Sequence, residues 1–137
     1  MALGKGQCIV AYDKIIAVHS RLDNRINYAL NGEKTSDGEH ILQTALNCGI
    51  TSAYRDMQAT KNRWDKTGGI LGYHLIHSYS PGEISPERAH KLGIEFAQQL
   101  VGDRFEAVIG THTDHEHIHC HIIFNSCLLY TSDAADD

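Results

Sequence analysis

The sequence lacks the features that would place it in a membrane or an oxidising compartment. None of its apolar runs approaches the roughly 20 residues that a bilayer-spanning helix needs. The N-terminus does not have the charged-then-apolar layout of a secretory signal. The four cysteines contain no Cys-x-x-Cys pair and no disulfide-like framework, which agrees with a reducing location. We therefore expect a cytoplasmic protein without a membrane partner.

A strong net charge is also missing. The 137 residues carry a formal charge of −5, and this length fits one domain with a modest core. Residues 127–137 resemble the translation of a transposon-end adapter used to prepare DNA for sequencing, the alternative being a natural acidic terminus, and we set this tail aside. Removing its three aspartates leaves 14 acidic and 12 basic residues, a charge of −2. Composition therefore gives no global case for nucleic-acid binding, and any such case must come from a site.

Apolar patterning predicts one α+β domain over residues 15–126, after a weakly patterned N-terminal extension at 1–14. The runs of β-branched and aromatic residues indicate strands. These are expected at 15–19, 41–48, 70–79, 105–112 and 118–125. Helical spacing of apolar residues predicts helices at 21–31, 52–64 and 86–100. We expect a mainly antiparallel sheet with helices packed on one face, a two-layer domain that is truncated at its C-terminal end.

Start signals mark two of these helices. Ser20 is the expected N-cap of the first, and Ser85 followed by Pro86 begins the third. The apolar stripe expected on the third helix consists of Ala89, Leu92, Gly93, Phe96 and Leu100.

The histidines are concentrated in one segment, with five of the ten between residues 112 and 121. Alternate side chains of a strand share a face, so His117, His119 and His121 point one way. A hairpin with the preceding strand brings His112 to the same face. Neutral imidazoles that converge from two strands form a nitrogen set with open coordination positions, as a catalytic metal requires. The alternative is a row of surface histidines.

Imidazole nitrogen alone does not name the metal, since it suits Zn, Mn, Fe, Ni and Cu. Asp114 could accept a hydrogen bond from a ligand imidazole and thereby fix its tautomer. Tyr28 lies toward the border of the apolar stripe expected on the first helix, a position that permits exposure.

Three segments stand in a characteristic order. Residues 20–35 carry a tyrosine and residues 72–83 a serine. Residues 112–125 contain a His-x-Asp, then a His-Cys-His and a downstream asparagine. In this order the segments resemble the first, second and third motifs of the relaxases, the mobilisation nucleases of conjugative and mobilisable plasmids. Relaxases are HUH endonucleases, and the resemblance covers about residues 15–126.

The resemblance implies a role for particular residues. Tyr28 would be the nucleophile, Asp114 a further catalytic residue and Ser78 a DNA contact, although Ser78 could equally cap the turn at Pro81. The implied metal ligands are His112, His119 and His121. His115 and His117 are additional.

The implied reaction is transesterification on single-stranded DNA, which gives a 5′-phosphotyrosyl adduct and a free 3′-hydroxyl. A divalent cation, Mg²⁺ or Mn²⁺, would polarise the scissile phosphate. The sequence has no Gly-x-x-x-x-Gly-Lys-Ser/Thr phosphate loop, which fits a reaction that needs no external energy source.

Further DNA contacts are expected from a locally basic stretch, which is otherwise an ordinary solvated helix face. Its basic residues are Arg55, Lys61, Arg63 and Lys66.

The resemblance also implies partners. These are single-stranded transfer-origin DNA, an accessory relaxosome protein and the coupling protein of a secretion channel. Other classes remain open: another HUH enzyme such as a replication initiator or transposase, a metal-dependent phosphodiester hydrolase, or a non-catalytic fragment that binds DNA or metal.

Overall fold

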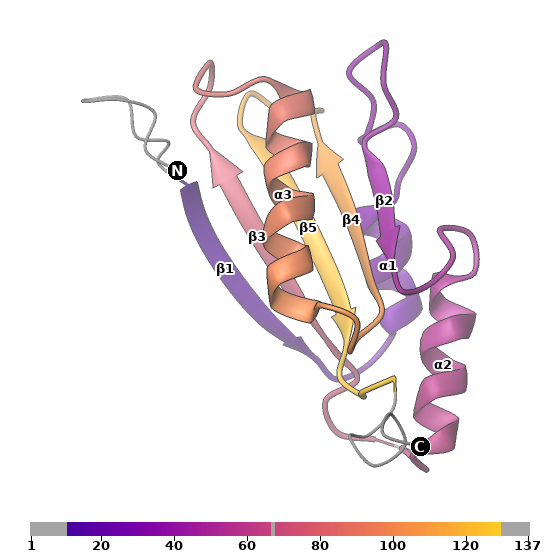
Figure 1. Cartoon of the computed structure of the whole chain (residues 1–137). Helices are drawn as coiled ribbons and strands as arrows, with labels where there is room; N and C mark the ends of the chain where they lie inside the picture. Colours follow the sequence, from indigo (N-terminus) through magenta and orange to yellow (C-terminus); the bar gives the residue numbers. More distant parts are fainter. Residues whose placement is uncertain (1–10, 67, 130–137) are drawn as a thin grey trace.

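The computed structural model of the chain describes residues 11–66 and 68–129. Strands and helices follow one another along the chain in an irregular alternation (Figure 1). The elements are β1 (Ala11–Val18), α1 (Leu22–Ala29), β2 (Gln43–Leu46), α2 (Ala53–Arg63), β3 (Gly72–Tyr79), α3 (Pro86–Val101), β4 (Ala107–His112) and β5 (Ile118–Asn125). Within the described residues, no helix is long and apolar enough to cross a membrane.

The five strands form one sheet in the order β1-β3-β5-β4-β2, and every pairing is antiparallel. The predicted α+β class with an antiparallel sheet is confirmed. β5 occupies the centre and is paired on both edges, by β3 and by β4. Residues that lie opposite each other in this register share a face of the sheet. The register therefore decides which side chains from different strands meet.

Helices cover both faces of the sheet, not one (Figure 1). α3 packs against Ile109, Cys120 and Ile122, while α1 and α2 pack against Val108 and Ile123 on the opposite face. The expectation of two layers with helices on one face is wrong. The reason is that β5 carries isoleucine at successive positions, so both of its faces bury apolar area and each requires a covering helix.

The start of β1 and the cap of α1 differ from expectation. β1 begins at Ala11, inside the segment expected to be an extension, because its first residues pair in register with β3. Backbone pairing with β3 makes these residues part of a strand, which the side-chain pattern does not predict. Ser20 is not the N-cap of α1; Arg21 occupies that position in the left-handed conformation, with φ 52°, and no side chain caps the helix.

α3 begins as predicted but presents a different face. Ser85 is its N-cap and accepts a hydrogen bond from the backbone N–H of Arg88, with Pro86 in the first turn. The predicted Ala89 and Gly93 are buried, whereas Phe96 is 38% exposed. The buried stripe consists of Ala89, His90, Gly93, Ala97 and Val101.

Buried polar contacts explain why His90 belongs to the buried stripe of α3. The imidazole of His90 lies within hydrogen-bond distance of the hydroxyls of Thr44 and Thr111, at 2.9 and 2.8 Å. The sheet thus satisfies a buried histidine that the apolar pattern left out of the core.

The adapter-like tail is described only in part. Residues 130–137 and residues 1–10 lie outside the described residues. Within the described part, the backbone of residues 128 and 129 accepts hydrogen bonds from Trp64 and Arg63.

Candidate active site

The predicted ligand histidines gather on the face of the sheet that carries α1. His112 lies opposite His119 in the β4–β5 register, and His121 follows two residues along β5. The ring centroids of His112 and His121 are 4.1 Å apart, and those of His119 and His121 are 6.2 Å apart. His74 on β3 joins this group, with its ring centroid 5.0 Å from that of His121. The structure thus brings together all three predicted ligands and adds a fourth imidazole.

Tyr28 stands beside these histidines. It occupies the last turn of α1, and its side chain is 46% exposed. The phenol ring is edge-on to His112 and His121, with centroid distances of 4.9 and 5.3 Å. The border position expected on the first helix therefore places the ring both in solvent and against the histidine group.

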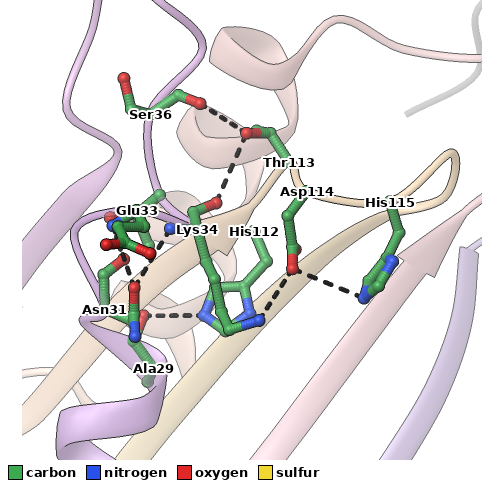
Figure 2. A network of polar contacts seen from close by, with 10 residues as sticks. Ala29, Asn31, Glu33, Lys34, Ser36, His112, Thr113, Asp114 and His115 are labelled. Carbon is green, nitrogen blue, oxygen red and sulfur yellow. Dashed lines mark hydrogen bonds and ion pairs between the residues drawn. The ribbon is translucent and has the colours of Figure 1, made fainter.

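Gly110 allows α1 to come this close. A Cβ at Gly110 would lie 1.8 Å from the carbonyl oxygen of Ala29, so any side chain would push α1 away from β4. Gly110 is also the register partner of His121. The same carbonyl accepts a hydrogen bond from Nε2 of His112 at 3.1 Å (Figure 2). The end of α1 is therefore fixed directly on the site.

Burial keeps the histidines neutral. It lowers the pKa of His121 to about 2, helped by His112, and the pKa of His74 to about 4, helped by Arg25. Burial also lowers the pKa of His112 and of His119. Only the neutral imidazole can donate a lone pair to a metal, so burial keeps these rings in the charge state that a cation would need.

The donor set fits a divalent cation in its chemistry. Within the described part of the chain, no group of three His, Cys, Asp or Glu side chains is arranged so that it could hold a metal ion. However, Nε2 of His121 is buried with no hydrogen-bond partner. Buried polar atoms are normally satisfied, and a cation would satisfy this one when the ring carries its proton on Nδ1. The histidines thus supply the right atoms on one face, although they do not converge on one point.

Asp114 pairs with Lys34 (Figure 2). The Lys34 ammonium donates to the Asp114 carboxylate at 2.8 Å, and Nε2 of His115 lies 3.5 Å from the same oxygen. The hydrogen bond from Lys34 lowers the pKa of Asp114. The Lys34 nitrogen also lies 5.8 Å from the centroid of the Tyr28 ring. Asp114 thus reaches the site through Lys34, while His112 is oriented by the Ala29 carbonyl.

Lys34 was not among the predicted site residues. It lies within the segment that resembles the first relaxase motif, but only the contact between the loop after α1 and the β4–β5 turn reveals its position. The backbone N–H of Thr113 donates to the carbonyl oxygen of Lys34 at 2.7 Å, and its hydroxyl donates to the carbonyl oxygen of Ser36 (Figure 2).

The predicted DNA contacts divide between the two ends of the sheet. Ser78 is partly buried and is the register partner of His119, so it lies on the histidine face. Lys61 is 2% exposed, and its ammonium contacts the side-chain oxygen of Asn125. Asn125 ends β5, about 20 Å along the strand from His119 near its beginning.

The other basic residues do not meet the histidines either. Arg55 is exposed on α2, and Arg63 donates to the backbone of Leu129 at the Asn125 end of the sheet. Lys66 follows α2 and is partly buried there. The structure therefore brings Ser78 to the candidate active site and leaves Arg55, Lys61, Arg63 and Lys66 on or near α2.

Comparison with known families assigns the chain. Residues 28–137 match the model of the relaxase family described as the MobA/VirD2-like nuclease domain. The chain belongs to this relaxase family. The match includes Tyr28, Ser78 and the histidines of β4 and β5, so it covers the whole candidate site.

Curated relatives agree with this assignment. The chain is 47% identical over 73 residues to the group II intron-interrupted relaxase LtrB of Lactococcus lactis subsp. cremoris strain MG1363, a match that covers 53% of this chain and 13% of that protein. It is 39% identical over 106 residues to a protein rlx of Staphylococcus aureus, which covers 77% of this chain and 30% of that relative. The chain thus spans less than a third of the length of these relatives.

Proposed function

We propose that this relaxase domain nicks single-stranded DNA, with Tyr28 as the nucleophile. The observation that carries the proposal is the position of Tyr28: a half-exposed phenol packed edge-on against two neutral, buried histidines. A tyrosine that only stabilised the core would be buried, with its hydroxyl hydrogen-bonded to a partner. Here the ring is open to a substrate on one side and faces the histidine group on the other.

In the proposed reaction, the phenol oxygen of Tyr28 forms a bond to the scissile phosphorus. The phosphorus–O3′ bond breaks, the tyrosine loses its proton, and the leaving 3′ oxygen gains one. The product is a 5′-phosphotyrosyl link and a free 3′-hydroxyl. One phosphodiester replaces another, so the strand can be rejoined without an external energy source.

His112, His119 and His121 would hold a divalent cation, Mg²⁺ or Mn²⁺, which when bound would offset charge on the phosphate oxygens. The contribution of the protein is to keep these imidazoles neutral by burial and to hold His112 through the Ala29 carbonyl. Ser78, which lies opposite His119, would donate a hydrogen bond to the phosphate backbone. Asp114 holds Lys34 beside the Tyr28 ring.

The proposed substrate is single-stranded DNA of a plasmid transfer origin, in the bacterial cytoplasm. Family membership supports this substrate, together with an accessory relaxosome protein and the coupling protein of a secretion channel as partners. The related Lactococcus protein is a relaxase by name, which is consistent with this class of substrate.

The proposal is tested by adduct formation. The chain is incubated with a random single-stranded DNA library and Mn²⁺ or Mg²⁺, and the products are run on a denaturing protein gel. We expect a shifted band that is absent with a chelator and absent in Tyr28→Phe. Tyr54→Phe, which changes a similarly exposed tyrosine on α2, is the matched control and keeps the band.

Each of the other outcomes would contradict part of the proposal. A band that survives Tyr28→Phe would move the nucleophile to another residue. Cleaved DNA without an adduct would favour a metal-dependent hydrolase. The absence of both a shifted band and cleaved DNA would contradict nicking activity of this fragment and favour a binding module.

The cation ligands are tested separately. We expect His119→Ala to abolish metal-dependent cleavage, because one of three imidazole ligands is lost. His40→Ala, which removes an exposed histidine in the loop before β2, should cleave normally. Full activity of His119→Ala would reject His119 as an essential ligand.

A further inference from the structure

A chain of hydrogen-bond contacts runs from α1 through β3 into the centre of the histidine group. A guanidinium nitrogen of Arg25 lies 3.1 Å from Nδ1 of His74. Nε2 of His74 lies 2.7 Å from Nδ1 of His121. Both imidazoles are 3% exposed. None of these contacts was expected from the sequence, and neither Arg25 nor His74 has a role in the reaction described above.

Arg25 determines which atom donates and which accepts in each of these hydrogen bonds. A guanidinium has only N–H donors, so Nδ1 of His74 must accept. A neutral imidazole carries one proton, so His74 has its proton on Nε2 and donates to Nδ1 of His121. His121 then carries its own proton on Nε2, the buried atom that has no hydrogen-bond partner. The hydrogen-bond network therefore determines the tautomer of both histidines.

We propose that Arg25 and His74 are positioning residues that hold His121 as its Nε2–H tautomer and so restrain cation binding at that nitrogen. The proposal rests on the function proposed above, in which His121 is a ligand. Binding through Nε2 requires a lone pair there and a proton on Nδ1. The His74–His121 bond would then reverse and place a proton on Nδ1 of His74, directly against the donors of Arg25.

The consequence is a link between the cation site and α1. Arg25 and Tyr28 are three residues apart on this helix and are therefore neighbours on its surface. Cation binding at His121 would require Arg25 to leave His74. Arg25, next to the proposed nucleophile on α1, thus regulates how readily His121 binds the cation.

The tautomer is measured first. Nitrogen-15 NMR of the metal-free chain, labelled at histidine, distinguishes the protonated from the unprotonated ring nitrogen of His121. We expect the proton on Nε2. A proton on Nδ1 of His121 in the metal-free protein would overturn the proposal. This readout needs neither DNA nor catalysis, so it stands even if the proposed nicking activity fails.

Cation affinity is measured second, by calorimetric titration with Mn²⁺. Arg25→Gln offers an oxygen that can accept from His74, so we expect affinity to rise roughly tenfold, the scale of second-layer effects at metal sites. Arg25→Lys keeps a donor-only cation and should match the unaltered chain. Arg21→Gln, at the N-cap of the same helix and paired with Asp23, is the control for charge and should also match.

The titration can contradict the proposal in two ways. Unchanged affinity in Arg25→Gln would remove the restraint attributed to Arg25. Equal tightening in Arg21→Gln would make the effect one of net charge. No Mn²⁺ binding by any variant would contradict the cation site of the proposed function, and the tautomer measurement would still decide the role of Arg25 and His74.

Discussion

At the scale of single residues, Lys61 shows how burial can redirect a charge that the sequence assigns to DNA. Its basic neighbours suggested a phosphate-binding stretch, but its side chain turns inward toward Asn125. Asn125 in turn donates to Glu106 at 2.9 Å, and Glu106 accepts from Thr60 at 2.6 Å. Lys61 therefore completes a buried polar network that ties α2 to the ends of β4 and β5.

We expect Lys61→Met to lower the free energy of unfolding by about 1–3 kcal/mol, because the side-chain oxygen of Asn125 loses its buried donor. Urea unfolding followed by circular dichroism measures this change. Arg55→Met removes the same charge from an exposed site on α2 and should leave the stability nearly unchanged. A Lys61→Met protein as stable as the unaltered chain, with weaker DNA binding, would return Lys61 to the role first predicted for it.

The histidine group could be predicted from the sequence only in part. Strand alternation alone placed His119 and His121 on one face, and a hairpin brought His112 to them; the structure has this arrangement. His74 is separated from His121 by 47 residues. Its contribution depends on the register between β3 and β5, which no local pattern encodes. Lys34 was not predicted because its partner Asp114 lies 80 residues away, in the turn between β4 and β5.

At the scale of elements, the placement of α1 depends on the absence of a side chain at Gly110. We expect Gly110→Ala to displace the end of α1, since the new Cβ would overlap the Ala29 carbonyl. Overpacking of this kind costs about 1–3 kcal/mol, and the shift moves Tyr28 away from His112 and His121. Adduct formation should therefore fall much more than stability alone explains.

A matched glycine separates the two effects. Gly32→Ala changes the loop just after α1, where an added Cβ meets nothing within 4 Å. Thermal unfolding and the adduct assay, run on both variants under conditions where both are folded, give the comparison. Full adduct formation by a folded Gly110→Ala protein would contradict the view that this contact positions Tyr28.

The sequence predicted the elements better than their packing. Ser85, Pro86 and the apolar spacing located α3, because local signals determine where a helix begins. The predicted face of α3 was right at Ala89 and Gly93 but left out His90, because Thr44 and Thr111, which satisfy it, come from two other strands. Helices on both sides of the sheet could not be predicted either, since short apolar runs do not show which neighbour covers each face.

At the scale of the whole molecule, buried neutral histidines make stability depend on pH. Burial lowers the pKa of His90 to about 4, from an ordinary value of 6.5. The unfolded chain therefore binds a proton below pH 6.5 that the folded chain refuses until about pH 4. Stability is lost as the pH falls through this window, and His74 and His121 add to the loss in the same direction.

We expect His90→Gln to reduce this pH dependence by up to about 1.4 kcal/mol per pH unit between pH 6 and 5. Glutamine can hydrogen-bond Thr44 and Thr111 but does not titrate, so the variant tests protonation apart from packing. Denaturant unfolding at pH 7.5, 6 and 5 supplies the slopes. Equal slopes for both proteins, or a chain that gains stability on acidification, would contradict this account.

The central claim is that the hydroxyl of Tyr28 takes the phosphate, and peptide mapping of the covalent adduct tests it most directly. The chain is reacted with single-stranded DNA and Mn²⁺, digested with nuclease and trypsin, and analysed by mass spectrometry. We predict that the peptide containing Tyr28 carries the added mass of a 5′-nucleotide. An adduct on any other residue, or cleaved DNA with every tyrosine unmodified, would contradict the assignment.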